Sequence, residues 1–309
     1  MTVIVRAYNA EKCIDKVVNS VLNSMYEGLI EIITCYDLGS KDHTLDVIKK
    51  VIANSNHYSN RVVRLIMHEH TTPFHALLEC GFTNATGRFI TILDYDNLFP
   101  PRHIEKMVRK AIETNKNFLF TRLYRFEDKS LKVIDSLQVP ENPCDINNLI
   151  RRNYIDGNTI FIDRSCLSII VNKLRKLNHR LYDLVHEDWL IALLGLRHCK
   201  CFFNNDSYVF YRIHSSNLTG IGKEDYRAKV FRLIKDVVTL MAFYELEKDT
   251  LTQHEINVLE QSLFERLYAL SKTLEKMHEK ATPISISSKL LSISLRLSRL
   301  INNILLRFY

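Results

Sequence analysis

Strand-like and helix-like segments alternate along the N-terminal third of the chain. Residues 3–5, 29–35, 62–67 and 89–93 are short apolar runs of the kind that form buried strands. The segments between them space their apolar side chains three and four residues apart, as an amphipathic helix does. Alternation about every thirty residues implies right-handed βαβ units. The sequence therefore predicts an α/β fold with a mainly parallel sheet flanked by helices.

Polar residues mark where the first two of these helices begin. We expect Asn9 to cap the first helix, whose apolar stripe includes Ile14 and Leu22, and Asp42 to cap the second. Residues 130–144 contain two prolines and are of mixed polarity, so they predict an irregular excursion or a hairpin.

The pattern of apolar and polar residues changes near residue 222. Heptad-like helical patterns predominate from residue 224 onward. We therefore expect an α/β domain over residues 1–222 and an all-helical extension over residues 223–309.

The last predicted helix, over residues 284–309, is amphipathic and basic. Its apolar stripe is flanked by Lys289, Arg296, Arg299 and Arg307, and the segment contains no acidic residue. Such a helix can lie in the headgroup plane of an anionic membrane. The alternative is that it packs on its own domain or on a second subunit as part of a homodimer, because its apolar surface is wider than a simple interfacial stripe.

The charge balance of the chain limits the classes of partner that it is expected to bind. Lys and Arg number 42 against 35 acids, which gives a formal net charge of +7 over 309 residues. A mildly basic balance fits anionic partners such as nucleotide diphosphates or acidic lipid headgroups. Recognition of nucleic acid would need a basic face interleaved with stacking aromatics, so we expect no nucleic-acid partner.

The seven cysteines are odd in number and scattered, with no Cys-x-x-Cys motif. This predicts neither a zinc site nor a disulfide framework, and it favours a reducing compartment such as the cytoplasm. We expect Cys199 and Cys201 to lie on one face of a strand. The chain opens directly into a strand-like segment, so no signal peptide is expected. It contains no run of eighteen apolar residues, so no membrane span is expected.

Two carboxylates follow the apolar strand at residues 89–93. Asp94 and Asp96 fall at its carboxyl end, which is the edge where open α/β sheets bind ligands. Asp37 follows an earlier strand in the same way. An Asp-x-Asp can hold a divalent cation and, through it, a phosphate. The chain has neither a Gly-x-Gly-x-x-Gly nor a P-loop, so a bound phosphate would depend on a metal and basic side chains.

Five motifs in sequence order resemble those of the family 2 glycosyltransferases, which are inverting enzymes of the GT-A fold that use nucleotide-sugar donors. The resemblance covers roughly residues 1–220. The motifs are Val3-Ile-Val-Arg-Ala-Tyr-Asn-Ala10, Glu31-Ile-Ile-Thr-Cys-Tyr-Asp-Leu-Gly-Ser40, Ala85-Thr-Gly-Arg-Phe-Ile90 leading to Asp94-Tyr-Asp96, Glu187-Asp188-Trp189, and Tyr211-Arg-Ile-His-Ser-Ser-Asn-Leu-Thr219.

The resemblance implies a nucleotide site at the first two motifs. Ala7 and Tyr8 would contact the nucleotide through their backbone, and Asp37 would recognise the base, which is most often uracil in the family. The sequence departs from the family pattern at Arg6, where a proline is usual, and at Leu38, where a second acid is usual. The departure at Leu38 leaves the base open, with a UDP-sugar as the expected donor.

The resemblance also implies a metal-assisted transfer of the hexosyltransferase type. Asp96 would ligate Mn²⁺ or Mg²⁺, with Asp94 nearer the ribose or sugar. His214 matches a position near the metal, where it is either a ligand or a structural histidine. Arg212 would hold phosphate oxygens or pair with an acid.

Asp188 matches the catalytic base of the family's Glu-Asp motif. A general base is needed because an acceptor hydroxyl is a poor nucleophile until a positioned carboxylate takes its proton. An acid here would also be favoured by the helix dipole alone. We expect a saccharide or lipid-linked acceptor, recognised by residues 130–144, residues 154–162 and the C-terminal helices, and a cytoplasmic protein, peripheral on the membrane if its last helix binds there.

Two other functions remain open at this point. A nucleotidyltransferase would also combine an α/β sheet with a metal-binding carboxylate pair, but it usually needs a glycine-rich phosphate loop. A degenerate transferase that serves as a binding or scaffold module is supported by Leu38 and by Glu79, since Leu78-Glu-Cys-Gly81 departs from the family's Arg-Asn-x-Gly. The retention of Asp94, Asp96 and Asp188 together argues against it.

Overall fold

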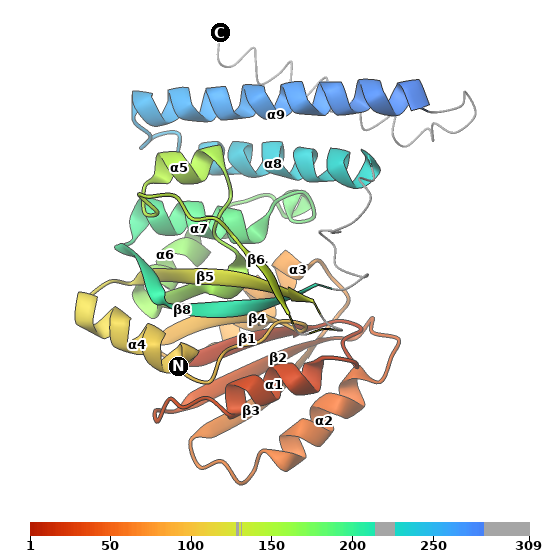
Figure 1. Ribbon diagram of the computed structural model, residues 1–309, viewed down its shortest axis with the longest axis vertical. Helices are drawn as coiled ribbons and strands as arrows, with labels where there is room; N and C mark the ends of the chain where they lie inside the picture. The colour runs from red at the N-terminus through yellow and green to blue at the C-terminus, as the bar shows by residue number, and fades with distance from the viewer. Residues whose placement is uncertain (128–129, 131, 214–225, 281–309) are drawn as a thin grey trace.

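An eight-stranded mixed sheet forms the centre of the structure, a computed structural model that describes residues 1–127, 130, 132–213 and 226–280 (Figure 1). The strand order is β3-β2-β1-β4-β7-β5-β6, and β8 pairs with β5. Neighbours among β1 to β4 are parallel, whereas β7 is antiparallel to β4 and β5. The predicted mainly parallel sheet is confirmed. The strands are β1 Thr2–Ala7, β2 Ile30–Asp37, β3 Arg61–His68, β4 Phe89–Asp94, β5 Phe118–Glu127, β6 Val133–Ser136, β7 Ile160–Asp163 and β8 Cys201–Ile213.

Helices cover both faces of this sheet. α1, α2 and α4 pack on one face, and η1, α6 and α7 pack on the other, with α8 and α9 stacked beyond α7 (Figure 1). The helical segments are α1 Ile14–Leu22, α2 Thr44–Asn54, α3 Pro73–His75, η1 Ala76–Phe82, α4 His103–Thr114, α5 Ile146–Arg151, η2 Gly157–Thr159, α6 Arg164–Leu174, η3 His179–Leu181, α7 Glu187–His198, α8 Tyr226–Glu247 and α9 Gln253–Lys280.

Strand β1 is buried on both faces, which explains its continuous apolar run. Val3 and Val5 belong to the core beneath α1, α2 and α4, whereas Ile4 belongs to the core beneath η1 and α7. Side chains of a strand alternate between the two faces of its sheet, so a strand covered by helices on both sides needs apolar residues throughout.

Helix α7 lies between the sheet and the C-terminal helices and is apolar around its middle. Residues 189–195 are all buried, and the indole Nε1 of Trp189 donates a hydrogen bond of 2.9 Å to the carbonyl of Leu149. A helix that is hydrophobic on every side is typical of the interior. The first turn of this helix carries the Glu187-Asp188 pair, so its burial fixes where those carboxylates lie.

The C-terminal helices share their apolar core with the α/β layer. Val230, Val237 and Leu259 belong to the same cluster as Ile4 and Trp189. The predicted boundary near residue 222 and the predicted helix over 284–309 lie outside the described residues. Within the described part of the chain, none of the helices combines the length and apolar character required to cross a membrane.

Two local predictions need correction. Asn9 does not cap α1, because its backbone is left-handed with φ of 49° and its side-chain oxygen accepts from the Lys41 amide at 2.8 Å. Asn tolerates this conformation better than most residues. Asp42 does not occupy the N-cap of α2 either, because that position is His43; the Asp42 carboxylate lies one residue earlier and accepts from the Thr44 amide at 3.1 Å. The segment at residues 130–144 contains β6, which forms a hairpin with β5.

The cysteine prediction was wrong. Six of the seven cysteines pair, as Cys35–Cys80, Cys144–Cys201 and Cys166–Cys199. Partners that are 33 to 57 residues apart meet only through the tertiary fold, so sequence spacing does not reveal them. Cys199 ends α7 and Cys201 begins β8, so the two do not share one face of a strand. The inference of a reducing compartment, drawn from the absence of a disulfide framework, therefore loses its basis.

The contact between α7 and β5 provides a test of this packing. A Cβ atom at Gly195 would overlap the fully buried ring of Phe118. We expect Gly195→Ala to lower the free energy of unfolding by roughly 1–3 kcal/mol through overpacking, despite the better helix propensity of alanine. Denaturant unfolding measures the change. Gly157→Ala is the control, because its Cβ would lie 3.4 Å from the Asp188 Cβ, an ordinary contact. Unaltered stability of Gly195→Ala would contradict the close approach.

Candidate active site

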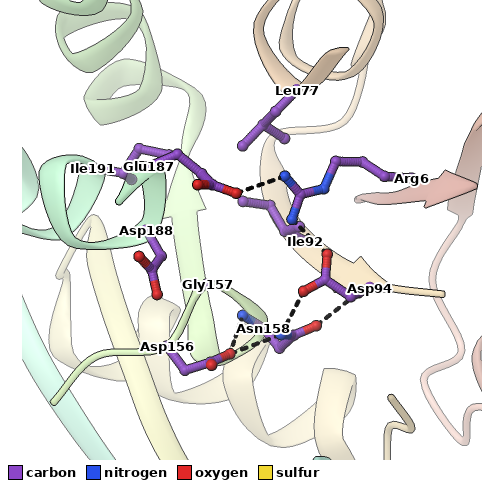
Figure 2. Close-up of a pocket in the computed structure, with 10 residues that line it drawn as sticks. All are labelled: Arg6, Leu77, Ile92, Asp94, Asp156, Gly157, Asn158, Glu187, Asp188 and Ile191. Atoms are coloured by element: carbon purple, nitrogen blue, oxygen red, sulfur yellow. Dashed lines mark hydrogen bonds and ion pairs between the residues drawn. The ribbon is translucent and has the colours of Figure 1, made fainter. Parts of the chain in front are cut away.

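A pocket opens where β1 and β4 end and α7 begins. It encloses about 320 Å³ of empty space, part of it open to solvent. Figure 2 shows the side chains around it, which come from the sheet edge, from the segment before β7 and from the first turn of α7. Its lining residues are Arg6, Leu77, Ile92, Asp94, Asp156, Gly157, Asn158, Glu187, Asp188 and Ile191.

Arg6 joins two sides of this pocket. Its Nη2 lies 2.6 Å from Asp94 Oδ1 and its Nη1 lies 2.8 Å from Glu187 Oε1 (Figure 2). Its Nη1 also donates to the Pro73 carbonyl at 3.2 Å. Burial would lower the pKa of Arg6, but the two carboxylates raise it above its ordinary value. The guanidinium is therefore a permanent positive charge at the edge of the pocket.

Asn158 holds the other side of Asp94. Its Nδ2 donates to Asp94 Oδ2 at 3.0 Å and to Asp156 Oδ1 at 2.7 Å, and its Oδ1 accepts from the Asp94 amide at 2.7 Å. Both carboxylate oxygens of Asp94 are thus engaged, one by Arg6 and one by Asn158. The orientation of Asp94 is fixed from two sides.

Asp188 and Asp156 face each other across the pocket. Figure 2 shows the carboxyl group of Asp188 pointing toward that of Asp156. Burial and the neighbouring charge of Glu187 raise the pKa of Asp188. Burial and the charge of Asp188 raise the pKa of Asp156 to about 7. A carboxyl group with a raised pKa is a stronger base once ionised, which suits a group that must take a proton from a hydroxyl.

Glu187 behaves in the opposite way to the acid that follows it. Burial would raise the pKa of Glu187, but the charge and hydrogen bond of Arg6 hold it below its ordinary value. Its place in the first turn of α7 adds the favourable field of the helix N-terminus. Glu187 therefore stays ionised as the partner of Arg6, while Asp188 is left as the titrating group.

Asp96 lies beside the end of β8, and the described residues place Arg212 next to it. The Nε of Arg212 donates to the Asp96 carbonyl at 2.8 Å, and its amide donates to Asn97 Oδ1 at 3.0 Å. Arg212 is buried and packs over the ring of Phe126. These contacts place the Asp96 and Arg212 motifs side by side. The roles predicted for Asp96 and Arg212 stay predictions. His214 lies outside the described residues.

The residues predicted to bind the nucleotide gather at the end of β2. Asp37 is buried and accepts from the Gly39 amide at 2.7 Å. His70 Nδ1 lies 3.0 Å from both oxygens of Asp37, and its ring lies 5.1 Å from that of Tyr8. Tyr8 is exposed, and the preceding Ala7 is buried at the end of β1. Strands β2 and β4 flank β1, so the Asp37 and Asp94 sites are separated by one strand.

Sequence reasoning missed four residues of these sites. Arg6 was noted only as a departure from the family pattern, and His70 was assigned no role. Asp156 and Asn158 were included only within residues 154–162 of the expected acceptor site. The one local signal was the Asp-x-Asn pattern at residues 156–158, in which Asp156 accepts from the Asn158 amide at 2.9 Å as turn-forming aspartates do. Arg6, His70 and Asn158 contact site residues that lie 33 or more residues away in the sequence.

The described residues provide a limited set of metal ligands. Among them, no three His, Cys, Asp or Glu side chains surround a common point. Asp94 uses both carboxylate oxygens within the protein. Of the predicted ligands, Asp96 remains within the described part of the chain. A single carboxylate fits a cation whose other ligands are donor phosphates and water, as is usual for Mg²⁺ bound with nucleotides.

Known proteins resemble much of this chain. The model of Glycosyl transferase family 2 matches residues 2–177, more than half of the 309 residues. An uncharacterized glycosyltransferase of Haemophilus influenzae is 23% identical over 253 residues, covering 80% of this chain and 89% of that protein. The chain therefore belongs to the family 2 glycosyltransferases, as its motifs predict.

Two further proteins illustrate the range of this similarity. The UDP-Glc:α-D-GlcNAc-diphosphoundecaprenol β-1,3-glucosyltransferase WfgD of Escherichia coli is 23% identical over 168 residues, covering 54% of this chain and 62% of WfgD. The mannosyltransferase PcManGT from Pyrobaculum calidifontis, solved in complex with GDP-Man and Mn²⁺, has a TM-score of 0.58 at 16% identity, covering 96% of this chain and 79% of PcManGT. The fold is of the predicted GT-A type.

The raised pKa of Asp156 predicts a pH-dependent stability. Its folded value of about 7 exceeds the ordinary 3.8, so the folded state keeps a proton that the unfolded state releases. The free energy of unfolding therefore falls as pH rises from 3.8 to about 7, by about 1.4 kcal/mol per pH unit and at most about 4 kcal/mol in all. We expect Asp156→Asn to lose this decline, so that its melting temperature relative to wild type is higher at pH 8 than at pH 4.

Asp145→Asn is the matched control for this measurement. Asp145 accepts from the amide and the side chain of Asn147, at 2.9 and 3.1 Å, just as Asp156 does with Asn158, but it does not line the pocket. If the melting temperatures of wild type and Asp156→Asn differ by the same amount at every pH from 4 to 8, the pKa of Asp156 is not raised.

Proposed function

We propose that this protein is an inverting glycosyltransferase that moves a hexosyl group from a nucleotide-diphosphate sugar to an acceptor hydroxyl, with Asp188 as the general base. The observation that carries the proposal is that Asp188 shares one pocket with Asp94 and Arg6 at the carboxyl end of the parallel strands. Open α/β sheets bind their ligands at this edge. Asp94 then faces the donor and Asp188 faces the acceptor.

The proposed reaction uses the environment of Asp188. Its carboxylate takes the proton of the acceptor hydroxyl, whose oxygen attacks the anomeric carbon from the face opposite the departing nucleoside diphosphate. Burial and the charge of Glu187, which raise the pKa of Asp188, make it a stronger base once ionised. General-base assistance of this kind typically contributes about 10²- to 10⁴-fold in rate.

The nucleotide is proposed to lie along the ends of β1 and β2. Ala7 and Tyr8 would contact it through their backbone, and Asp37 with His70 would face the base. The Asp37 carboxylate is already held by the Gly39 amide and by His70, which supports a fixed orientation. We propose a UDP-sugar as donor, since the donor named for WfgD is UDP-Glc. The GDP-Man of PcManGT shows that a protein with this fold can accept another base.

The diphosphate is proposed to bind through a cation and Arg212. Asp96 would hold Mn²⁺ or Mg²⁺, with His214 as a further proposed ligand, and the solved complex of PcManGT contains Mn²⁺. A bound cation neutralises charge that develops on the leaving diphosphate. Arg212, fixed by the Asp96 carbonyl, would add a positive charge on the same side.

A lipid-linked saccharide is the proposed acceptor. The acceptor named for WfgD is a GlcNAc-diphosphoundecaprenol. The β5–β6 hairpin, the segment before β7 and the C-terminal helices would surround such an acceptor. Residues 284–309 are proposed to attach the protein peripherally to an anionic membrane or to join two copies of the chain.

Donor binding tests the metal assignment. We expect a nucleoside diphosphate to raise the melting temperature of the wild-type protein only when Mn²⁺ is present, because a ligand of the folded state stabilises it. Asp96→Asn should abolish this metal-dependent binding in calorimetry. Asp135→Asn is the control, since Asp135 pairs with Arg125 on the exposed β5–β6 hairpin. Equal affinity of Asp96→Asn and wild type would remove Asp96 from the metal site.

Turnover tests the base. We expect Asp188→Asn to bind donor as wild type does and to lower turnover by roughly 10² or more, because the amide cannot accept the hydroxyl proton. Calorimetry with the donor and a transfer assay separate the two effects. Transfer by Asp188→Asn at close to the wild-type rate would assign the base to another group.

A further inference from the structure

Five residues form a hydrogen-bonded chain around the pocket. The chain runs from Asp156 to Asn158, Asp94, Arg6 and Glu187, with donor–acceptor distances of 2.6 to 3.0 Å at each step. Glu187 precedes Asp188 in sequence, and Asp188 faces Asp156, so the chain returns to its starting point (Figure 2). The proposed transfer reaction assigns roles to Asp94 and Asp188 but none to Asp156.

Asp156 is placed to influence both of these residues. Its Oδ1 accepts from the amide of Asn158 at 2.9 Å and from the Nδ2 of the same residue at 2.7 Å. The Asn158 side chain then fixes Asp94. The Asp156 carboxyl group therefore orients a donor-side residue through hydrogen bonds while it faces the acceptor-side base across the pocket.

The charges around Asp156 are unbalanced. The carboxylates that face the pocket are Asp94, Glu187 and Asp188, and Arg6 is the cation among the lining residues. Beyond the lining, Lys235 of α8 acts on Glu187 and Asp188, and His186 acts on Asp188. A fourth ionised carboxylate would add negative charge close to an anionic donor. The pKa of Asp156, raised to about 7 by burial and by Asp188, fits a group that keeps its proton while Asp188 is ionised.

We propose that Asp156 is a positioning residue that retains a proton beside the ionised base Asp188, and that this proton keeps the pocket receptive to an anionic donor. The inference rests on the proposed transferase function. In the neutral form Asp156 holds Asn158 and Asp94 in place without adding charge. Loss of the proton places a further negative charge in the donor's environment and weakens donor binding. The loss of transfer activity at low pH is set separately, by protonation of the base Asp188.

The test compares donor affinity at pH 6 and pH 8. A nucleotide sugar is the probe, because its diphosphate has no ionisation in this range that would mimic the effect. We expect the wild-type dissociation constant for UDP-glucose, with Mn²⁺ present, to rise roughly three- to tenfold more between these pH values than that of Asp156→Asn, as one added charge in a partly buried site predicts. Asp145→Asn, which removes a capping carboxylate outside the pocket, should follow wild type.

A second variant guards against misfolding. Asp156→Ser keeps an oxygen that can accept from the Asn158 amide but cannot ionise, so it should reproduce the pH-independent affinity. Equal pH dependence in wild type and in folded Asp156→Asn or Asp156→Ser would overturn the inference. If the role of Asp156 were purely structural, its variants would weaken donor binding by the same factor at both pH values. That result would also overturn the inference.

A titration without substrate separates this inference from the proposed function. Carboxyl NMR of the unliganded protein should show an aspartate that titrates near 7, absent in Asp156→Asn and moved to lower pH in Asp188→Asn, because Asp188 supplies part of the perturbation. An Asp156 that titrates in the ordinary range would refute the inference even in an active enzyme. A protein that shows this titration but binds no nucleotide sugar would instead refute the proposed function and, with it, the donor-side role.

Discussion

The ion pairs of Arg6 are the interaction on which the pocket depends. One guanidinium joins Asp94, 88 residues away, to Glu187, 181 residues away, and so ties the ends of β1 and β4 to the first turn of α7. Burying three charges together is favourable only when geometry is good and further hydrogen bonds complete the site. Here the contacts are 2.6 and 2.8 Å, and the Pro73 carbonyl accepts a third bond. Removal of Arg6 would leave two part-buried carboxylates without their cation, so this one side chain fixes the three elements as a unit.

The same guanidinium gives two consecutive acids opposite chemistry. Glu187 contacts Arg6 and has a lowered pKa. The pKa of Asp188 is raised by burial and by Glu187, which outweigh the charges of His186 and Lys235. Titratable neighbours whose pKa values are pushed apart are how acid and base roles are usually divided in an enzyme. Arg6 stands where the family pattern usually has a proline, and this departure is therefore consistent with an active site. It supplies the charge that keeps Glu187 ionised and leaves Asp188 to titrate.

Sequence patterns predicted those features that depend on local spacing. The strands β1, β2 and β4 were predictable because each is buried on two faces and is mainly apolar. Asp94 and Asp188 were predictable because each belongs to a recognisable motif. Features that depend on distant partners were not. Asn158 acts on Asp94, 64 residues away, and nothing in its own neighbourhood indicates this. The cysteine pairs and the left-handed Asn9 have the same cause, since tertiary contacts decide both.

The C-terminal helices complete the support of the N-terminal end of α7, which carries the proposed base. His186, which precedes α7, lies 3.0 Å from Asp236 of α8, and its amide donates to Thr239 Oγ1 at 2.8 Å. Arg266 of α9 packs over the ring of Trp189, the residue that follows Asp188. Asp188 is thus held from the sheet side through Arg6 and Glu187 and from the opposite side through α8 and α9. Because catalytic groups must be held within a fraction of an ångström of their productive positions, the helices beyond the α/β layer contribute to the geometry of the proposed base as directly as the sheet does.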